Sequence, residues 1–237
     1  INVKLTAEMP DEMQRNTISI ENAVKEAILS KFHSASDVNL TGTEQIIMNV
    51  LVYYIRQILK KDAELAPFTV ISLEKAFYSQ FEVSIGGETK NIRLGGIIDR
   101  TDKNEKTYRI LDYKTGDISM EIKSIESLFD EKNRSRSGEW LQLLIYCEVF
   151  SGAEGLEVTP AIYPVRRLAG NDFTGRLVIK SGRDLSEDVS VYSAIREVFV
   201  PPLRHTLETI FSRNEDFRMT DNKQICGYCP YRELCKR

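Results

Sequence analysis

The sequence lacks several features that would place it in a specialised class of protein. No apolar run reaches the 18 residues that a membrane-spanning helix needs, and the first residues do not show the basic-then-apolar pattern of a secretory signal. Internal repeats and low-complexity tracts are also missing. Hydrophobic residues make up 42% of the 237 residues and charged residues 28%, as in ordinary globular proteins. We therefore expect a soluble, cytoplasmic protein with a packed core and no membrane partner.

Histidine and excess positive charge are scarce too. The chain has two His residues and a formal net charge of -3, so it does not carry the overall basic charge that marks many nucleic-acid-binding domains. Any binding of nucleic acid would have to rest on a local patch. The one evident basic connection is the segment Arg134-Ser135-Arg136, which we expect to be a loop. We interpret His33 and His205 as surface or structural residues.

Cysteine is nearly confined to one end of the chain. Three of the four cysteines lie within the last dozen residues, at Cys226, Cys229 and Cys235. In a cytosolic protein such spacing suggests metal or cluster ligation before disulfides. Cys147 stands apart within an apolar segment, and we interpret it as a small buried apolar residue.

The spacing of apolar residues predicts helices near both ends of the chain. Residues 16–32 and 43–61 place apolar side chains at steps of three and four, with Thr43 as the expected N-cap of the second helix. Helical patterns return at residues 118–130 and 139–150, and again from about 184 to 213. We expect Pro201-Pro202 to interrupt this last helix.

Between these helices the pattern is typical of strands. Residues 68–77, 81–85, 90–99 and 107–113 are rich in β-branched and aromatic residues and predict a meander, with turns at Gly86-Gly87 and at residues 102–106. A further strand pair is expected at 156–165 and 174–180. This order predicts an α/β fold, a central mixed β-sheet flanked by α-helices. We divide the chain into an N-terminal helical part at 1–66, a core at 67–215 and a cysteine-containing tail at 216–237.

Asp112 and Lys114 are the first candidate site residues. They are two apart on an expected strand, so both side chains point to one face. A carboxylate there can hold a hard divalent cation, and an ammonium group beside it can position the attacking water and stabilise charge that develops on a phosphate. Asp99 ends the preceding strand, and a hairpin across residues 102–106 would bring it to the same end of the sheet. Two carboxylates with room for water suit Mg²⁺.

Three sequence blocks resemble those of RecB-type nucleases in the PD-(D/E)XK superfamily, as found in the RecB and AddB components of bacterial helicase-nucleases. The blocks are GGIIDRTD, LDYKTGD and LQLLIY, in that order. The resemblance implies a restriction-endonuclease-like core and a Mg²⁺- or Mn²⁺-dependent nuclease. It also implies that Asp99 and Asp112 bind the metal and that Lys114 assists the hydrolytic water. Gln142 and Tyr146 match the third block, and their spacing of four puts them on one helix face.

The same resemblance points to residues outside the three blocks. Relatives often carry a metal-site Glu on the strand before the hairpin, for which Glu74 is the candidate and Glu82 the alternative. Related nucleases also place a metal-binding His on an early helix, and neither His33 nor His205 fits that position. Either this His lies upstream of residue 1, in a longer protein of which this chain is a C-terminal part, or the site is weakened.

The C-terminal cysteines also resemble a family feature. AddB-like nucleases and certain CRISPR-associated relatives end in a similar triad, which joins one upstream cysteine to hold a [4Fe–4S] cluster. By resemblance, three of the cluster ligands would be Cys226, Cys229 and Cys235. The fourth would precede this chain, so the cluster is expected in the full-length protein.

The function that the resemblance implies is hydrolysis of DNA phosphodiester bonds. The expected context is an exonuclease in DNA repair or recombination, working with a helicase subunit or domain. Two alternatives stand beside it. One is a catalytically impaired DNA-binding or scaffolding module with the same fold, and the other is a cysteine-based metal or redox protein. The residues themselves are compatible with exonuclease or endonuclease action and with DNA or RNA.

Overall fold

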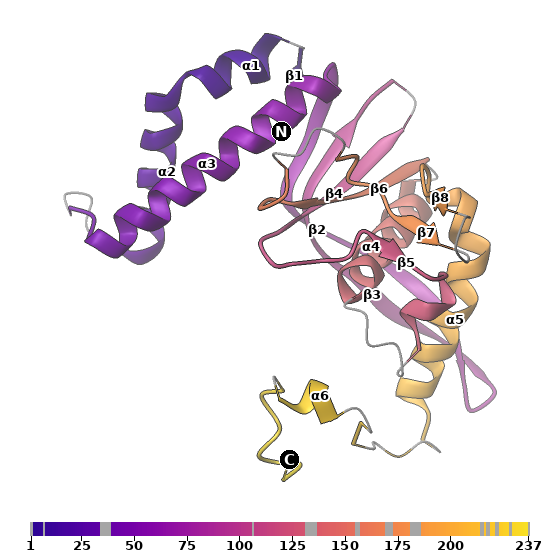
Figure 1. The fold of residues 1–237 in the computed structure, drawn as a ribbon. Coiled ribbons are helices and arrows are strands. Elements are labelled where there is room, and N and C mark those ends of the chain that lie inside the picture. The colour runs from indigo at the N-terminus through magenta and orange to yellow at the C-terminus, as the bar shows by residue number, and fades with distance from the viewer. Residues whose placement is uncertain are drawn as a thin grey trace.

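Helices and strands follow one another in groups along the chain, with helices α1 to α3 before most of the strands (Figure 1). A computed structural model describes residues 2–6, 8–33, 39–105, 107–130, 137–154, 157–168, 173–180, 186–213, 216, 219–220, 223–227 and 229–236. The elements, in chain order, are β1 (Val3–Leu5), α1 (Glu8–Arg15), α2 (Thr17–Phe32), α3 (Gly42–Leu65), β2 (Phe68–Ile85), β3 (Glu88–Lys103), β4 (Tyr108–Lys114), β5 (Glu121–Ile122), a 3₁₀ helix (Glu126–Leu128), α4 (Gly138–Glu154), β6 (Val158–Pro164), β7 (Val178–Lys180), β8 (Ser186–Asp188), α5 (Ser193–Phe211) and α6 (Lys223–Cys226). The expected loop Arg134-Ser135-Arg136 lies outside the described residues.

A five-stranded sheet in the order β1-β2-β3-β4-β6 forms the centre. Its strands pair antiparallel except β4 and β6, which are parallel. Parallel neighbours need a crossover connection, and α4 lies in the connection between these two. A small second sheet has the order β5-β7-β8. The predicted α/β fold with a central mixed sheet flanked by helices is confirmed.

The two faces of the sheet are covered by different helices because side chains alternate along each strand. On one face, Ile110 and Ile162 join a core cluster with Leu143 and Leu144 of α4. On the other face, Leu111 belongs to a cluster that includes Tyr163 and is flanked by Tyr54 and Ile58 of α3. At β4 the sheet is therefore enclosed between α4 and α3.

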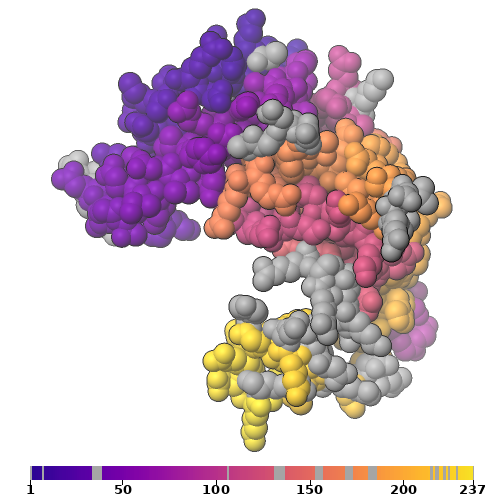
Figure 2. All heavy atoms as spheres, in the orientation of Figure 1, coloured from indigo at the N-terminus to yellow at the C-terminus, as the bar shows by residue number. Residues whose placement is uncertain are grey.

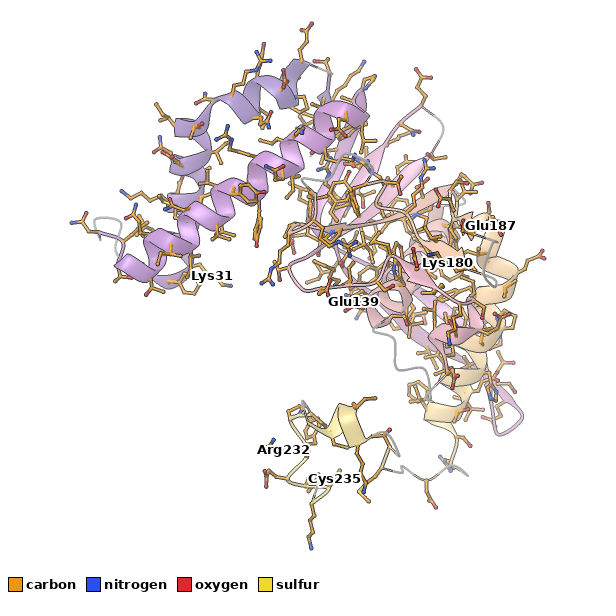
Figure 3. All side chains as sticks on the ribbon, in the orientation of Figure 1. Lys31, Glu139, Lys180, Glu187, Arg232 and Cys235 are labelled. Atoms are coloured by element: carbon orange, nitrogen blue, oxygen red, sulfur yellow. The ribbon has the colours of Figure 1, made fainter. Side chains whose placement is uncertain are left out.

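The N-terminal helices form an arm that extends away from the sheet (Figure 1). Along this arm α2 packs on α3, with Ile20, Val24 and Ile28 buried against Val52. Lys31, labelled in Figure 3, lies at the end of the arm farthest from the sheet. In the space-filling view the arm and the core diverge, which leaves a hollow between them (Figure 2). The arm meets the core near the C-terminal end of α3, where Asp62 is buried.

The start of α3 differs from the expectation. Thr41, not Thr43, is the N-cap, and the helix begins at Gly42. The side chain of Thr41 accepts a hydrogen bond from Glu44 N, while the Glu44 carboxylate accepts one from Thr41 N at 2.7 Å. This reciprocal capping box satisfies two backbone donors at the helix start, and Thr43 has no carboxylate or amide three residues ahead with which to form one. The assignment of Thr43 was therefore wrong.

The helix expected at residues 118–130 is also wrong. This segment holds the short strand β5 and the 3₁₀ helix. Its serine hydroxyls bond to nearby backbone instead, from Ser119 to Glu121 O and from Ser127 to Ser124 O. Such bonds compete with the helical hydrogen-bond ladder. The apolar residues Ile118, Ile122 and Ile125 are nevertheless buried. Their spacing therefore indicates burial in the core and does not indicate a helix.

Three other elements differ in extent or pairing. The segments 68–77 and 81–85 form one strand, β2, and the expected pair at 156–165 and 174–180 is split between two sheets as β6 and β7. Helix α5 begins at Ser193, after β8, whereas residues 181–185 lie outside the described part. Pro201 and Pro202 lie inside this helix, where Phe199 and Leu203 anchor the chain in the core on either side. None of the described helices is both long and apolar enough to cross a membrane.

Candidate active site

Three acidic residues occupy corresponding positions on neighbouring strands. The β3–β4 pairing sets Arg100 opposite Leu111, so the same register brings Asp99 level with Asp112. Oδ2 of Asp99 accepts a hydrogen bond from Tyr113 N at 2.8 Å, which holds the end of β3 against β4. On the other side, the β2–β3 register puts Glu74 level with Asp99. Glu74 is exposed and has a φ of 47°, a left-handed conformation that interrupts the regular alternation of β2.

A chain of polar contacts leads from Asp112 to α4. Lys114 Nζ lies 2.8 Å from Asp112 Oδ2 and donates a hydrogen bond to Gln142 Oε1 at 3.1 Å. Gln142 Nε2 in turn donates to the hydroxyl of Tyr146 at 2.9 Å. The structure thus brings Asp112, Lys114, Gln142 and Tyr146 together. Gln142 and Tyr146 are four residues apart on α4, so they lie on one face of the helix and support the Lys114 side chain from one side.

Two consecutive glycines in β3 make room for this arrangement. Gly95 has a φ of 141°, and a Cβ atom there would lie 2.1 Å from the carbonyl oxygen of Phe77. At Gly96, a Cβ atom would lie 3.0 Å from both Cε1 and the hydroxyl oxygen of Tyr146. Gly95 therefore allows the close approach of two strands, and Gly96 allows the Tyr146 ring to approach the backbone of β3.

Asp112 is an unusual carboxylate because it is almost fully buried. Burial raises the pKa of its carboxyl group, the adjacent Lys114 ammonium lowers it, and the charges of Asp99 and Glu139 raise it further. Glu139, in the first turn of α4, was not among the sequence candidates. Its Oε2 is buried and has no hydrogen-bond partner among the residues that the structure describes, and Figure 3 shows Glu139 on the side of the core that faces the hollow. Only its place three residues before Gln142 could have pointed to it.

The donor atoms at this site fit a hard divalent cation. Asp112 Oδ2 is buried, and its partner among the described residues is the Lys114 ammonium group at 2.8 Å. Asp99 uses Oδ2 for Tyr113 N, and its second oxygen has no hydrogen bond within the described part of the chain. Oxygen donors of this kind suit Mg²⁺ or Mn²⁺. Among the described residues no group of three or more His, Cys, Asp or Glu side chains is placed to hold a metal, so a metal here would have Asp99 and Asp112 as its protein ligands and water or phosphate as the others.

The opposite face of the same strands carries a buried ionic anchor. Arg100 donates to both carboxylate oxygens of Asp62, at 2.7 and 3.1 Å, and to Asp102 at 2.7 Å. It also donates to the hydroxyl of Tyr113 at 3.0 Å. These paired contacts satisfy charges that would be costly to bury alone. Because Arg100 follows Asp99 and Tyr113 follows Asp112, the anchor of α3 and the carboxylate row share the same two strands.

Other sequence candidates lie elsewhere. Glu82 is eight residues further along β2 than Glu74, roughly 27 Å away at the usual strand rise. His33 Nε2 is 2.7 Å from Glu44 Oε1 at the start of α3, about 27 Å along the helix from Asp62. His205 is an exposed residue of α5. Neither histidine joins the carboxylate row, as the sequence suggested.

The cysteines of the tail are far from this site in the chain's arrangement (Figure 3). Among the described residues Cys226, Cys229 and Cys235 form no disulfide and are of intermediate exposure, and Cys229 N bonds to Cys226 O. Cys147 is fully buried in the core, and burial raises the pKa of its thiol well above the usual range. It is therefore a core residue without access to a ligand.

Comparison with known proteins gives the family. Among solved structures, the chain is similar to that titled "Crystal structure of SSO0001", with 12% sequence identity, 92% of this chain and 95% of that chain covered, and a TM-score of 0.30. A search of curated proteins finds no match. The model of the PD-(D/E)XK nuclease superfamily matches residues 5–236. The row of Asp99 and Asp112 with Lys114 beside it lies within a match that spans almost the whole chain, which therefore belongs to the PD-(D/E)XK nuclease superfamily.

Proposed function

We propose that the chain is a Mg²⁺- or Mn²⁺-dependent deoxyribonuclease domain whose site is formed by Asp99, Asp112 and Lys114. The observation that carries the proposal is the Lys114 ammonium, held 2.8 Å from the buried Asp112 carboxylate on a strand next to that of Asp99. This arrangement combines a place for a hard cation with a positive group for the scissile phosphate.

Each residue has a role that follows from its contacts. Asp99 and Asp112 would hold the metal, which supplies Lewis acidity toward the phosphate and a more acidic bound water. Lys114 orients the attacking water and faces the charge that develops on the phosphate. Gln142 fixes the ammonium group through its 3.1 Å hydrogen bond, and Tyr146 fixes Gln142. Glu74, level with Asp99 on β2, is proposed as a further ligand, direct or through water.

Cleavage of DNA by Asp112 variants tests this function. Purified protein should degrade linear DNA when Mg²⁺ or Mn²⁺ is added, and Asp112→Asn should remove the activity because the amide cannot supply an anionic ligand. The matched control is Asp117→Asn, which changes an exposed aspartate of the same sequence block and should keep full activity. Equal cleavage by the wild type and Asp112→Asn would contradict the proposal.

A second candidate function is DNA binding without turnover. It is favoured by one observation, that the described residues place no histidine beside the carboxylates. If the wild-type protein binds DNA in a salt-dependent way but does not cleave it with either metal, this second function holds. Cleavage of DNA by the wild-type protein with either metal would exclude it.

The finer context is proposed from the three sequence blocks. We propose an exonuclease of DNA repair or recombination, with a helicase subunit or domain as its partner and the cytoplasm as its location. We also keep the division into a helical part at 1–66, a core at 67–215 and a tail at 216–237. For the tail, the proposed ligand set of a [4Fe–4S] cluster in the full-length protein is Cys226, Cys229 and Cys235. Iron and sulfide analysis of that protein, prepared without oxygen, tests this assignment.

A further inference from the structure

A shallow groove lies on α3 next to the end of β6. It has a volume of about 430 Å³ and is lined by Ile46, Asn49, Val50, Tyr53, Tyr54 and Arg166. Tyr53 is 49% exposed, so one side of its ring is open to a ligand, and Arg166 is exposed at the rim. The groove therefore combines an accessible aromatic ring with a cation.

The groove continues along α3 as a basic stripe. Tyr53, Arg56 and Lys60 are spaced by three and four residues, which puts them on one face of the helix. Arg56 and Lys60 are exposed, and within the described part of the chain neither they nor Arg166 has an ion-pair partner. Glu64, which follows on this face, is paired with Lys61 at 2.7 Å. In a chain with a net charge of -3, these three free cations form a local positive patch.

The groove lies on the α3 side of the sheet, and the Lys114 side chain lies on the α4 side, so the two come near each other only where β4 and β6 end. The β4–β6 register sets Lys114 opposite Pro164, and Lys114 O accepts a hydrogen bond from Val165 N at 3.0 Å. Arg166 is the next residue and forms the rim of the groove. The groove therefore begins one residue after Val165, which is bonded to the backbone of Lys114.

We propose that Tyr53, Arg56, Lys60 and Arg166 form a track for a single strand of DNA that leads to Lys114. This inference rests on the proposed nuclease function and adds the form of the substrate. The open ring of Tyr53 and the apolar lining can stack on base faces, while the cations neutralise phosphates. A duplex hides its base faces, so a track with an exposed aromatic ring and apolar lining matches an unpaired strand.

Binding without metal tests the track separately from cleavage. The anisotropy of an end-labelled oligothymidylate is measured in EDTA against the full chain, for the wild type and for variants. Tyr53→Ala should weaken binding roughly fivefold or more, because it removes one stacking platform, whereas Tyr53→Phe should restore it. Arg56→Ala combined with Lys60→Ala should reduce the slope of log K against log salt by roughly 1.4, about 0.7 for each phosphate that is no longer neutralised. Lys25→Ala, an exposed unpaired lysine of α2, is the control and should leave both quantities unchanged.

The outcomes separate this proposal from the nuclease assignment. If Asp112→Asn abolishes cleavage but Tyr53→Ala binds oligothymidylate as tightly as the wild type, the track is wrong and the nuclease function stands. If Tyr53→Ala weakens binding in a protein that never cleaves DNA, the track is supported and the nuclease function fails. Tighter binding of a blunt duplex than of oligothymidylate, with the same loss in Tyr53→Ala, would overturn the single-strand assignment. A groove occupied by another protein would leave oligothymidylate binding unaffected by all of these variants, and this result also overturns the track.

Discussion

At the scale of single residues, Gly96 is the clearest example of a position whose lack of a side chain serves the site. The Tyr146 ring occupies the space in which a Cβ atom of residue 96 would lie, at 3.0 Å from its hydroxyl oxygen. The ring can therefore reach Gln142, which in turn reaches Lys114. The orientation of the Lys114 ammonium group therefore depends on the absence of a Cβ atom at position 96.

Gly96→Ala is accordingly expected to reduce DNA cleavage by roughly tenfold or more, because it displaces Tyr146 and loosens the support of Lys114. The melting temperature should change little, since the ring can tilt away from the added methyl group. The matched control is Gly116→Ala, where a Cβ atom meets nothing within 4 Å. Cleavage rates and melting curves of both variants check this, and equal rates for the two would contradict it.

At the scale of elements, α3 is attached to the sheet by a buried ion pair. The Asp62–Arg100 contact is bidentate and lies beneath a cluster in which Tyr54 and Ile58 cover β4. Removal of Asp62 leaves the buried Arg100 with Asp102 as its remaining carboxylate partner, which it shares with Arg109, whereas removal of an exposed pair costs little.

Asp62→Ala should therefore lower the free energy of unfolding by about 3 to 5 kcal/mol. Glu64→Ala, two residues away on the same helix, removes an exposed carboxylate from its pair with Lys61 and should cost less than about 1 kcal/mol. Urea unfolding of both variants measures the difference. A similar small loss for both would show that Arg100 is satisfied by Asp102 and Tyr113 without α3.

Sequence patterns correctly predicted the helices and strands in which the spacing of apolar residues matches that of a single regular element. Residues 139–150 and 16–32 are helical as expected, and Asp112 and Lys114 share a face because β4 is regular. The pattern failed where side chains bonded to their own backbone, as at Ser119 and Ser127, and where a fold partner was distant in sequence, as for β7 with β5. Glu139 could not be recognised because its position depends on where α4 crosses the sheet.

At the scale of the whole molecule, the described core clusters end well before the C-terminus. The cluster beneath α4 and α5 includes Leu203 and, partly buried, Leu207, and none of the described residues beyond 207 joins it or the other clusters. The N-terminal helices, by contrast, contribute Tyr54 and Ile58 to the face of the sheet. The two ends of the chain therefore differ in what they add to stability.

A chain that ends after Arg213 should keep its melting temperature within about 2 °C, since it loses little buried apolar area. A chain that begins at Pro67 should fail to fold cooperatively, because Leu111 and Tyr163 would lose their cover and Arg100 its partner. Calorimetry of the two truncated proteins and of the full chain makes the comparison. A large loss on removal of the tail would contradict this view of the core.

Residues of the carboxylate row alternate with residues of the ionic anchor along β3 and β4. This alternation limits where insertions and deletions can be tolerated. Inserting or deleting one residue within either strand would turn Asp99 or Asp112 toward α3 and the neighbouring anchor residue toward α4. Both the site and the attachment of the arm would be lost at once. Changes in length should instead be tolerated in the turn between the strands, where Thr107 N bonds to the side chain of Asn104 at 2.8 Å and no core residue is displaced. Homologues of different length are thus expected to differ in that turn and to keep the two strands without gaps.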